Sequence, residues 1–223
     1  MRKVIIALLL LSIGVAKAQN VQTHYDMGKD RGYLTTTVEM FKPDNYGSTF
    51  FFIDMDYNGE KNGISLAYWE ISRNLKLGKL PVQLHLEYNG GLYIGEPKQF
   101  SGSINNSFLT GVSYPLPIKG GSFEVSALYK YIDGITNAAD IQFTGVWFVP
   151  LFKGKVSFTG FVDFWSQGLG NDNSNWVFLT EPQLWYNATK HLSLGSEVEI
   201  SNNFIIGSDG MQVMPTLAAK WSF

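Results

Sequence analysis

Twelve segments of this sequence alternate between apolar and polar residues, and this alternation restricts what the chain can fold into. Residues 155–165 show the pattern best: Val156, Phe158 and Phe164 share one parity, and Asp163 belongs to the other. Successive side chains of a strand point to opposite faces of the sheet. Each segment therefore predicts a strand with one apolar and one polar face, and none shows the period of a helix.

The predicted strands are spread evenly over the chain after residue 18. They cover residues 21–27, 33–41, 49–57, 64–74, 82–92, 104–114, 122–131, 140–149, 155–165, 176–186, 192–200 and 211–223. No linker, composition shift or low-complexity tract divides this stretch, so residues 19–223 are expected to form one domain. No apolar run in it is long enough for a membrane-spanning helix, which takes roughly 20 residues.

The connections between these segments alternate between two chemical types. Those after even-numbered strands contain Lys every time and Pro in four of five, namely KPDNYGS, LKLGKLP, PLPIKGG, PLFKG and NATKH. The others, such as NGEKNG and SQGLGNDNSN, are richer in Gly and Asn. Since an antiparallel chain reverses at every connection, each type gathers at one edge of the sheet. Two chemically different rims suggest the two sides of a membrane.

The first 18 residues have the composition of a secretory signal peptide. Arg2 and Lys3 precede an apolar stretch, and Ala16 and Ala18 form a small-residue cleavage site at its end. The alternative is a retained transmembrane helix, but the apolar run is about 13 residues long, and spanning needs roughly 20. We therefore expect export through the Sec pathway and removal of residues 1–18.

Composition excludes several classes of function. Removal of Arg2, Lys3 and Lys17 with the signal leaves 14 of the 17 basic residues against 19 acidic ones, so nucleic acid is not expected as a partner. The chain has no cysteine, which excludes disulfides and thiol chemistry. It also lacks G-x-S-x-G, H-E-x-x-H and a phosphate-binding glycine loop, so neither an enzyme nor a bound cofactor is expected.

A membrane barrel and an exported β-sandwich would both alternate in this way, and the aromatic residues favour the barrel. Closure of an even-stranded sheet removes the open edges that lipid forbids. Aromatic residues gather at the ends of the predicted strands, as in the girdles of outer-membrane barrels. The last segment ends on Phe223, which resembles the signal by which the barrel-assembly machinery recognises its substrates. We predict an all-β antiparallel transmembrane barrel of about 12 strands in the bacterial outer membrane, with short periplasmic turns and longer extracellular loops.

If the apolar parity faces lipid, the polar parity lines the lumen, and its charged members are mostly acidic. The predicted wall of the solute path consists of Glu39, Phe52, Asp54, Asp56, Glu70, His85, Glu87, Lys130, Phe161, Asp163, Trp165, Glu181, Trp185, Glu197 and Glu199. The same parity includes His24, Asp26, Glu124, Asp140, Lys220, Phe41, Phe50 and Phe148. Aromatic rings beside carboxylates can stack a planar solute and accept hydrogen bonds from its hydroxyls. The alternative is that these side chains pair with one another and fill the barrel.

Three stretches resemble the nucleoside-specific outer-membrane channels of the Tsx type. They are YLTTTVEMFKPDNYGSTFFFIDMDYNG at residues 33–59, YWEISRNLKL at 68–77 and VWFVPLFKGKVSFTGFVDFWSQ at 146–167. The resemblance covers most of the mature chain in order and implies a twelve-stranded, monomeric barrel with a narrow channel that admits nucleosides. The chain departs from that family in its short NGEKNG loop and in the nucleoside-contacting positions, which do not match one by one. This indicates a separate branch of the superfamily.

Three hypotheses for the function follow. The first is a passive channel for small polar solutes, with nucleosides as the candidate; the second is a closed or plugged barrel with a structural or surface-binding role. The third is a barrel hydrolase, although the predicted outer face offers no Ser/His pair. A metal site at His24 and His85 is not predicted, because isolated histidines in a polar lumen are more often hydrogen-bonded structural groups. Ca²⁺ at the GNDNSN loop of residues 170–175 is not predicted either, because the loop lacks the spacing of a known calcium loop.

Overall fold

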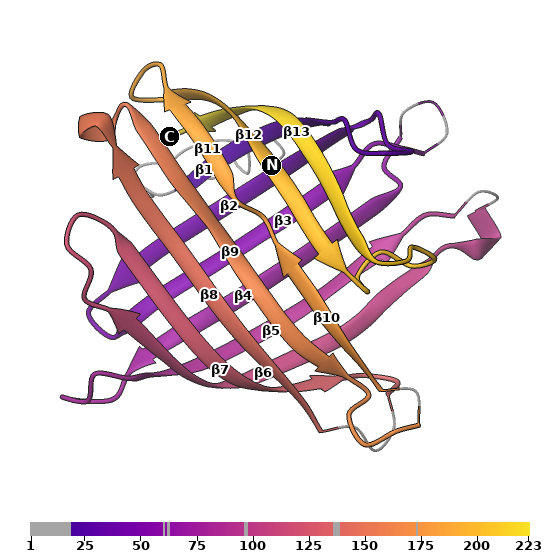
Figure 1. The fold of residues 1–223 in the computed structure, drawn as a ribbon, viewed down its shortest axis with the longest axis horizontal. Coiled ribbons are helices and arrows are strands. Elements are labelled where there is room, and N and C mark those ends of the chain that lie inside the picture. The colour runs from indigo at the N-terminus through magenta and orange to yellow at the C-terminus, as the bar shows by residue number, and fades with distance from the viewer. Residues whose placement is uncertain (1–18, 60, 62, 96–97, 136–138, 173) are drawn as a thin grey trace, which may run out of the picture.

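The chain folds into a single closed β-barrel (Figure 1). The computed structural model describes residues 19–59, 61, 63–95, 98–135, 139–172 and 174–223, so the predicted signal peptide lies outside the described residues. The strands are β1 (Gln19–Asp26), β2 (Leu34–Asp44), β3 (Gly47–Asp56), β4 (Leu66–Lys76), β5 (Gln83–Tyr93), β6 (Gly102–Leu116), β7 (Ser122–Ile132), β8 (Asp140–Leu151), β9 (Val156–Gln167), β10 (Asn175–Thr180), β11 (Gln183–Asn187), β12 (Leu192–Asn202) and β13 (Met211–Ser222).

Each strand pairs antiparallel with its neighbours around the barrel. From β1 to β9 the order in the sheet follows the order in the chain, and β13 pairs with both β12 and β1. This last pairing closes the sheet and leaves no free edge, which lipid would not tolerate. Strands β10 and β11 both pair with β9 and β12, so they occupy one position in a barrel of twelve.

The predicted strand over residues 176–186 is thus divided into β10 and β11, because the ladder of hydrogen bonds is interrupted between them. Both parts keep the same alignment with the neighbouring strands. The break falls at Glu181 and Pro182. Proline has no N–H to donate to the ladder, and Gly160, which faces Pro182 from β9, has a φ of 149°. A Cβ atom at Gly160 would lie 2.5 Å from the Glu181 carbonyl oxygen, so only glycine fits this close approach of two backbones.

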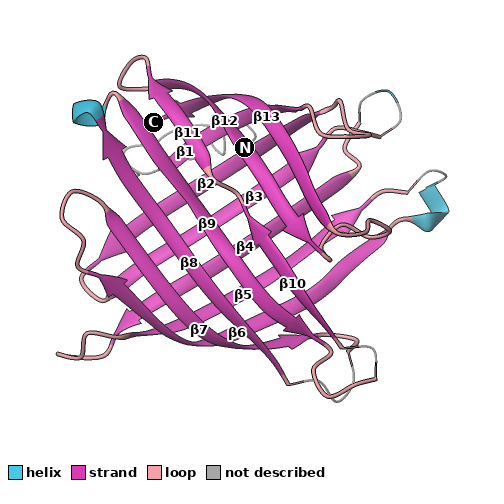
Figure 2. Cartoon of the chain, in the orientation of Figure 1, coloured by secondary structure: helices cyan, strands magenta, loops and turns pink. Residues whose placement is uncertain are grey.

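The two rims of the barrel differ as the sequence predicts (Figure 2). At one rim the connections are short: Asn45 and Tyr46 join β2 to β3, and a single 3₁₀ turn, η4 (Phe152–Gly154), leads from β8 to β9. Longer connections form the other rim, and one of them contains the 3₁₀ turn η3 (Lys98–Phe100). Exposed lysines at the short rim include Lys79, Lys119, Lys153 and Lys190, whereas Asp30, Asp133, Asp172 and Asp209 lie in long connections.

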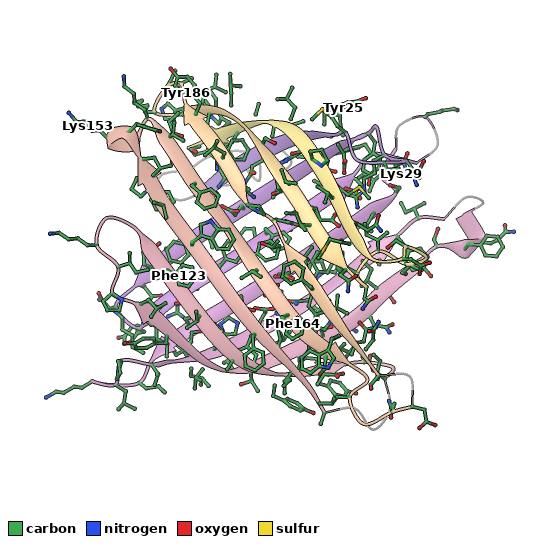
Figure 3. The ribbon with its side chains drawn as sticks, viewed as in Figure 1. Tyr25, Lys29, Phe123, Lys153, Phe164 and Tyr186 are labelled. Carbon is green, nitrogen blue, oxygen red and sulfur yellow. The ribbon has the colours of Figure 1, made fainter. Side chains whose placement is uncertain are left out.

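The outer surface of the barrel is apolar and aromatic. In β1, Tyr25 is 48% exposed between the buried side chains of His24 and Asp26, so the exposed parity is the outward one. Stacked aromatic pairs follow this surface, among them Phe164 with Trp176 at 4.7 Å between ring centroids. Figure 3 shows Tyr25, Phe123, Phe164 and Tyr186 among the outer side chains, and it places Lys153 and Lys29 at opposite ends of the barrel. Among the described residues, no helix is both long enough and apolar enough to cross a membrane.

Candidate functional site

The barrel interior brings together the residues predicted to line a solute path. Residues that lie directly opposite each other on adjacent strands point to the same face. The buried residues of β1 point inward, so their partners on β2 also point inward, and the same step from strand to strand identifies the inward residues of the whole barrel. On this basis the predicted residues all project inward: Glu39, Phe52, Asp54, Asp56, Glu70, His85, Glu87, Lys130, Phe161, Asp163, Trp165, Glu181, Trp185, Glu197 and Glu199.

One row of the wall alternates acceptors with an aromatic ring. Glu39, Phe52, Glu70 and Asn89 stand opposite one another on β2, β3, β4 and β5. Glu39 accepts a hydrogen bond of 2.9 Å from the Asn20 side chain. Asn89 is 5% exposed, and within the described residues its Oδ1 atom accepts no hydrogen bond. We call these four residues the acceptor row.

Aromatic side chains flank the ring of the acceptor row on both sides. The ring centroids of Phe50 and Phe52 lie 6.0 Å apart, and those of Phe52 and Tyr68 lie 6.0 Å apart. The Tyr68 hydroxyl donates a hydrogen bond of 2.6 Å to Glu70 Oε1. Asp54, the next inward residue after Phe52 on β3, accepts a hydrogen bond from the Thr37 hydroxyl of β2. The wall of β2 to β5 therefore presents a strip of rings bordered by carboxylates.

A second interior group surrounds Lys130 on β7. The Lys130 ammonium donates to Gln142 Oε1 at 2.8 Å and lies 4.2 Å from the centroid of the Trp165 ring. It is 7% exposed and attracted by Asp163, Glu70 and Glu87, among other carboxylates. A cation over the face of an indole is stabilised by the ring quadrupole. The chain thus supplies its own ammonium group to this aromatic and acidic part of the wall.

A third interior group surrounds Lys220 on β13. Its ammonium lies 3.9 Å from the ring centroid of Trp185, which is completely buried. The Trp185 indole N–H donates to Gln183 Oε1 at 2.9 Å, and the Gln183 amide donates to Glu197. Lys220 is also attracted by Glu39 and Glu197. The same combination of ring, ammonium and carboxylate therefore occurs twice in the interior.

Carboxylates from opposite walls face each other across the barrel. In Figure 1, β3 and β4 form part of the far wall, and β9 to β11 form part of the near wall. Glu181, at the β10–β11 break, is repelled by Asp54 and Glu70 of the far wall as well as by Glu197. Because the interior has more carboxylates than basic groups, its potential is negative, and low-dielectric walls strengthen that potential.

Ion pairs tie the long connection between β1 and β2 to interior carboxylates. The Arg31 guanidinium contacts Asp26 at 2.8 Å and Glu199 at 3.0 Å. Next to it in the same connection, burial raises the pKa of Tyr33 to about 12, so its hydroxyl stays neutral at physiological pH. Loss of one partner of a buried ion pair strongly destabilises the folded protein, because the other charge is left without compensation. Arg31 therefore fixes this connection at the mouth of the barrel.

The interior histidines are held by hydrogen bonds. His24 contacts Thr216 and Gln22, each at 3.1 Å. His85 contacts Asn74 at 2.7 Å and Glu87 at 2.8 Å. In the part of the chain that the structure describes, no three His, Asp or Glu side chains are grouped so that they could hold a metal ion.

An apolar cluster lies inside the barrel near the long-loop rim. Trp165, Val177 and Leu179 are buried together, and Phe161 packs against them. Phe204, from the connection between β12 and β13, meets Trp165 edge to face at 6.0 Å. Phe161 and Trp165 are among the residues predicted to line the wall, whereas Phe204 lies in a connection, where strand alternation gives no signal. These side chains narrow the interior at one end.

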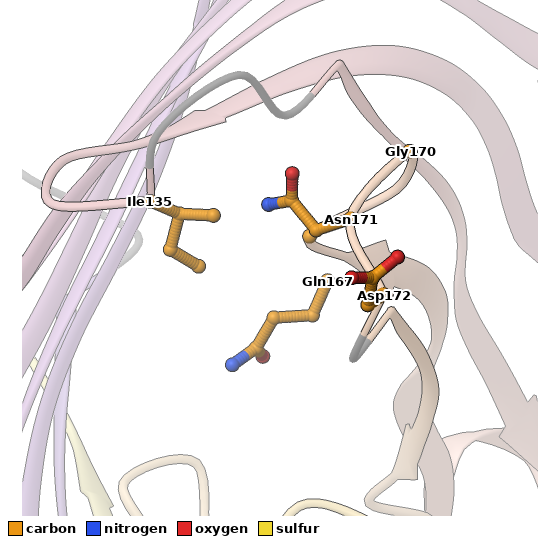
Figure 4. Close-up of a pocket in the computed structure, with 6 residues that line it drawn as sticks. Ile135, Gln167, Gly170, Asn171 and Asp172 are labelled. Carbon is orange, nitrogen blue, oxygen red and sulfur yellow. The ribbon is translucent and has the colours of Figure 1, made fainter.

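A cavity of about 600 Å³ opens among the long connections of the same rim (Figure 4). Gln167 lines it from the end of β9, Gly170 and Asp172 line it from the β9–β10 connection, and Ile135 lines it from the β7–β8 connection. The β9–β10 connection is held by Asp140, which accepts hydrogen bonds from the Ser166 hydroxyl and from two backbone N–H groups that follow.

Residues 18–223 match a protein family described as a domain of unknown function (DUF5020). The chain belongs to the DUF5020 family. Among solved structures, the DUF5020 barrel is similar to the NanC porin, with a TM-score of 0.59 at 13% identity, over 92% of this chain and 100% of that chain. It is also similar to the KdgM porin in complex with disordered oligogalacturonate, with a TM-score of 0.53 at 9% identity, over 92% and 99%. A search of curated proteins found no match.

These similarities confirm the predicted fold of the DUF5020 chain, a closed barrel with twelve strand positions of the kind found in outer-membrane porins. They support a porin-like family and carry no information on nucleosides, so the Tsx resemblance is supported only at the level of the barrel. The proteins that share the fold are described as porins and not as enzymes.

Proposed function

We propose that the chain is an outer-membrane channel through which small polar solutes without a net negative charge diffuse passively. The observation that carries the proposal is the acceptor row with its flanking rings, because it offers both a stacking surface and hydrogen-bond acceptors on the interior wall. A twelve-stranded barrel lies between filled eight-stranded barrels and the wide 16- to 18-stranded porins, so a narrow passage lined by side chains is expected.

Nucleosides fit this wall and are the solutes that the Tsx resemblance implies. A planar base can pack on Phe52, and the rings of Phe50 and Tyr68 extend the same surface. Ribose hydroxyls and exocyclic amines are donors, and Glu39 and Glu70 are acceptors. Such contacts slow a solute only slightly, which suits a channel whose sites must bind weakly enough to release.

The proposed solutes differ in charge from oligogalacturonate, the solute in the KdgM complex. Oligogalacturonate carries a carboxylate on each sugar, and the interior of this barrel is itself acidic. Like charges in a low-dielectric wall repel. We therefore expect oligogalacturonate and other polyanions to be excluded.

We further propose the route by which the barrel reaches the membrane. Residues 1–18 would direct export through the Sec pathway, and the barrel-assembly machinery would recognise β13 and the terminal Phe223, which is exposed and aromatic. The outward apolar surface is complete around one chain, which supports a monomer in outer-membrane lipid.

Liposome swelling tests the channel directly. Proteoliposomes placed in isotonic nucleoside, neutral sugar or amino acid should swell, with nucleosides faster than sugars of similar size. Those in oligogalacturonate should not. Absence of swelling in all solutes, with protein that is folded by circular dichroism, would contradict a channel.

A closed barrel with a surface-binding role is the second candidate, and the apolar cluster around Trp165 favours it. If this cluster seals the interior, liposomes stay impermeable while the long connections still bind a partner. Removal of Phe204 would then open the barrel. A barrel hydrolase is the third candidate, and turnover of phospholipid or ester substrates by the purified protein would identify it.

A further inference from the structure

Three parts of the interior wall combine aromatic rings with carboxylates, and two of them already hold an ammonium group. Lys130 lies over Trp165 at 4.2 Å, and Lys220 lies over Trp185 at 3.9 Å. The third part is the acceptor row with Phe50 and Tyr68. Within the described residues no lysine or arginine contacts Glu70 or Asn89.

The third part has acceptors in excess of donors. Glu70 Oε1 accepts the Tyr68 hydroxyl, and the Asn89 Oδ1 atom, buried in the wall on the next strand, accepts nothing from the described residues. A buried acceptor without a donor is costly. The carboxylate of Glu70, the phenol oxygen of Tyr68 and Oδ1 of Asn89 offer three acceptors, which equals the number of N–H groups of a primary ammonium.

The spacing of these acceptors suits an organic cation better than a metal ion. Glu39 and Glu70 stand two strands apart, which is about 9.6 Å between backbones, with Phe52 between them. Carboxylates that far apart do not share one metal ion, and no metal-binding group is found among the described residues. An ammonium beside Glu70 and Asn89, in contact with a ring at Phe52, uses all three elements of the wall.

We propose that Glu70, Asn89 and Tyr68, with the Phe52 ring, form a binding subsite for the primary ammonium group of a small organic cation. The proposal rests on the proposed channel function and names a class of solute for it: amines with a flat or short apolar body. The two resident lysines show the geometry that the interior uses for such a group. Lys130 attracts Glu70 from a distance but does not contact it, so the arriving solute supplies the ammonium in direct contact with these acceptors.

Benzylammonium and benzyl alcohol test the subsite, because they have similar size and shape and differ in charge. Equilibrium binding to the folded protein in neutral micelles, measured by ligand-observed NMR, should favour benzylammonium. Glu70→Gln should reduce that preference about tenfold, the value of one charge-assisted hydrogen bond. Glu124→Gln removes one interior carboxylate outside the acceptor row and should change the preference less than about twofold.

Asn89 provides a test in both directions. Asn89→Asp adds a charge and should strengthen benzylammonium binding, whereas Asn89→Leu should weaken it as Glu70→Gln does. Equal binding of the two probes, or equal losses in Glu70→Gln and Glu124→Gln, would overturn the subsite. Liposome swelling separates the two proposals: swelling without preference for the amine refutes the subsite alone, and preferential binding without swelling refutes the channel alone.

Discussion

At the scale of single residues, Asp140 is the side chain on which a whole connection depends. It is completely buried and accepts bonds from the Ser166 hydroxyl at 2.9 Å and the Gly168 and Leu169 N–H groups at 3.0 and 2.9 Å. Asp140→Ala leaves these donors unpaired and should lower the free energy of unfolding by about 3 kcal/mol. Guanidinium unfolding in micelles measures this. Asp133→Ala, an exposed acid of the preceding connection, is the control and should have little effect.

Asp163 tests the sign of the interior field. It accepts a hydrogen bond from the Thr144 hydroxyl and attracts Lys130. Asp163→Lys changes the interior charge by two units and should lower the permeability ratio of K⁺ to Cl⁻ roughly thirtyfold, since each unit charge at 4 Å in water contributes about 1 kcal/mol. The reversal potential in planar bilayers gives the ratio. Asp209→Lys, in an exposed connection, should shift it far less; loss of membrane assembly in Asp163→Lys would instead contradict the interior placement.

The face that a residue occupies could be predicted from the sequence, whereas its contacts could not. Alternation assigns Glu70 and Asp163 to the polar parity without any knowledge of the sheet. The lack of a hydrogen-bond donor to Asn89 Oδ1 among the described residues depends on how the side chains around it pack, and the approach of Glu181 to Asp54 depends on closure, which brings strands distant in the sequence within electrostatic range. Such neighbours have no local signal in one sequence.

At the scale of elements, the break between β10 and β11 depends on a glycine of the neighbouring strand. Gly160→Ala places a methyl group 2.5 Å from the Glu181 carbonyl oxygen in a backbone conformation with a φ of 149°. We expect a loss of about 3 kcal/mol in the free energy of unfolding. Gly145→Ala is the matched control, because its methyl group meets a flexible Val162 side chain at 3.1 Å. Equal stability of the two variants would show that the break tolerates a side chain.

The connection between β12 and β13 contacts the interior wall near the long-loop rim. Phe204 covers Trp165 from this connection, at 6.0 Å between rings. Phe204→Ala should raise the single-channel conductance by roughly half, because an apolar constriction resists wetting. Phe100→Ala, an exposed residue of another long connection, serves as the control. An unchanged conductance would place the narrowest point elsewhere in the barrel.

Strands could be predicted from the sequence because their signal is local. The segment predicted at 122–131 is β7 (Ser122–Ile132), and that at 192–200 is β12 (Leu192–Asn202). The segment at 176–186 also alternates throughout, but it divides at Pro182. The division also depends on Gly160, because only a glycine leaves room for the backbone at Glu181 and Pro182. Gly160 precedes Pro182 by more than twenty positions and faces it only in the folded sheet.

At the scale of the whole molecule, the short rim and the interior carry opposite charge. Lys119, Lys153 and Lys190 stand exposed at the short turns, and the passage behind them is bordered by Glu39, Glu70 and other acids. In a conducting barrel, the acidic interior would favour cations, and the lysines of the short rim would favour anions. Two regions of opposite ion preference in series pass current unequally in the two directions, as the two halves of a semiconductor junction do. Mobile ions accumulate in such a passage under one polarity of voltage and are depleted under the other.

The barrel should therefore rectify. Current through single channels is expected to differ between equal positive and negative voltages in 0.1 M salt, where charges act over about 10 Å, and to become symmetric in 1 M salt, where they act over about 3 Å. Replacement of the three rim lysines by Gln should remove the asymmetry while leaving cation selectivity. Two rims that the chain builds from different turn residues would thus give the proposed pore a preferred electrical direction.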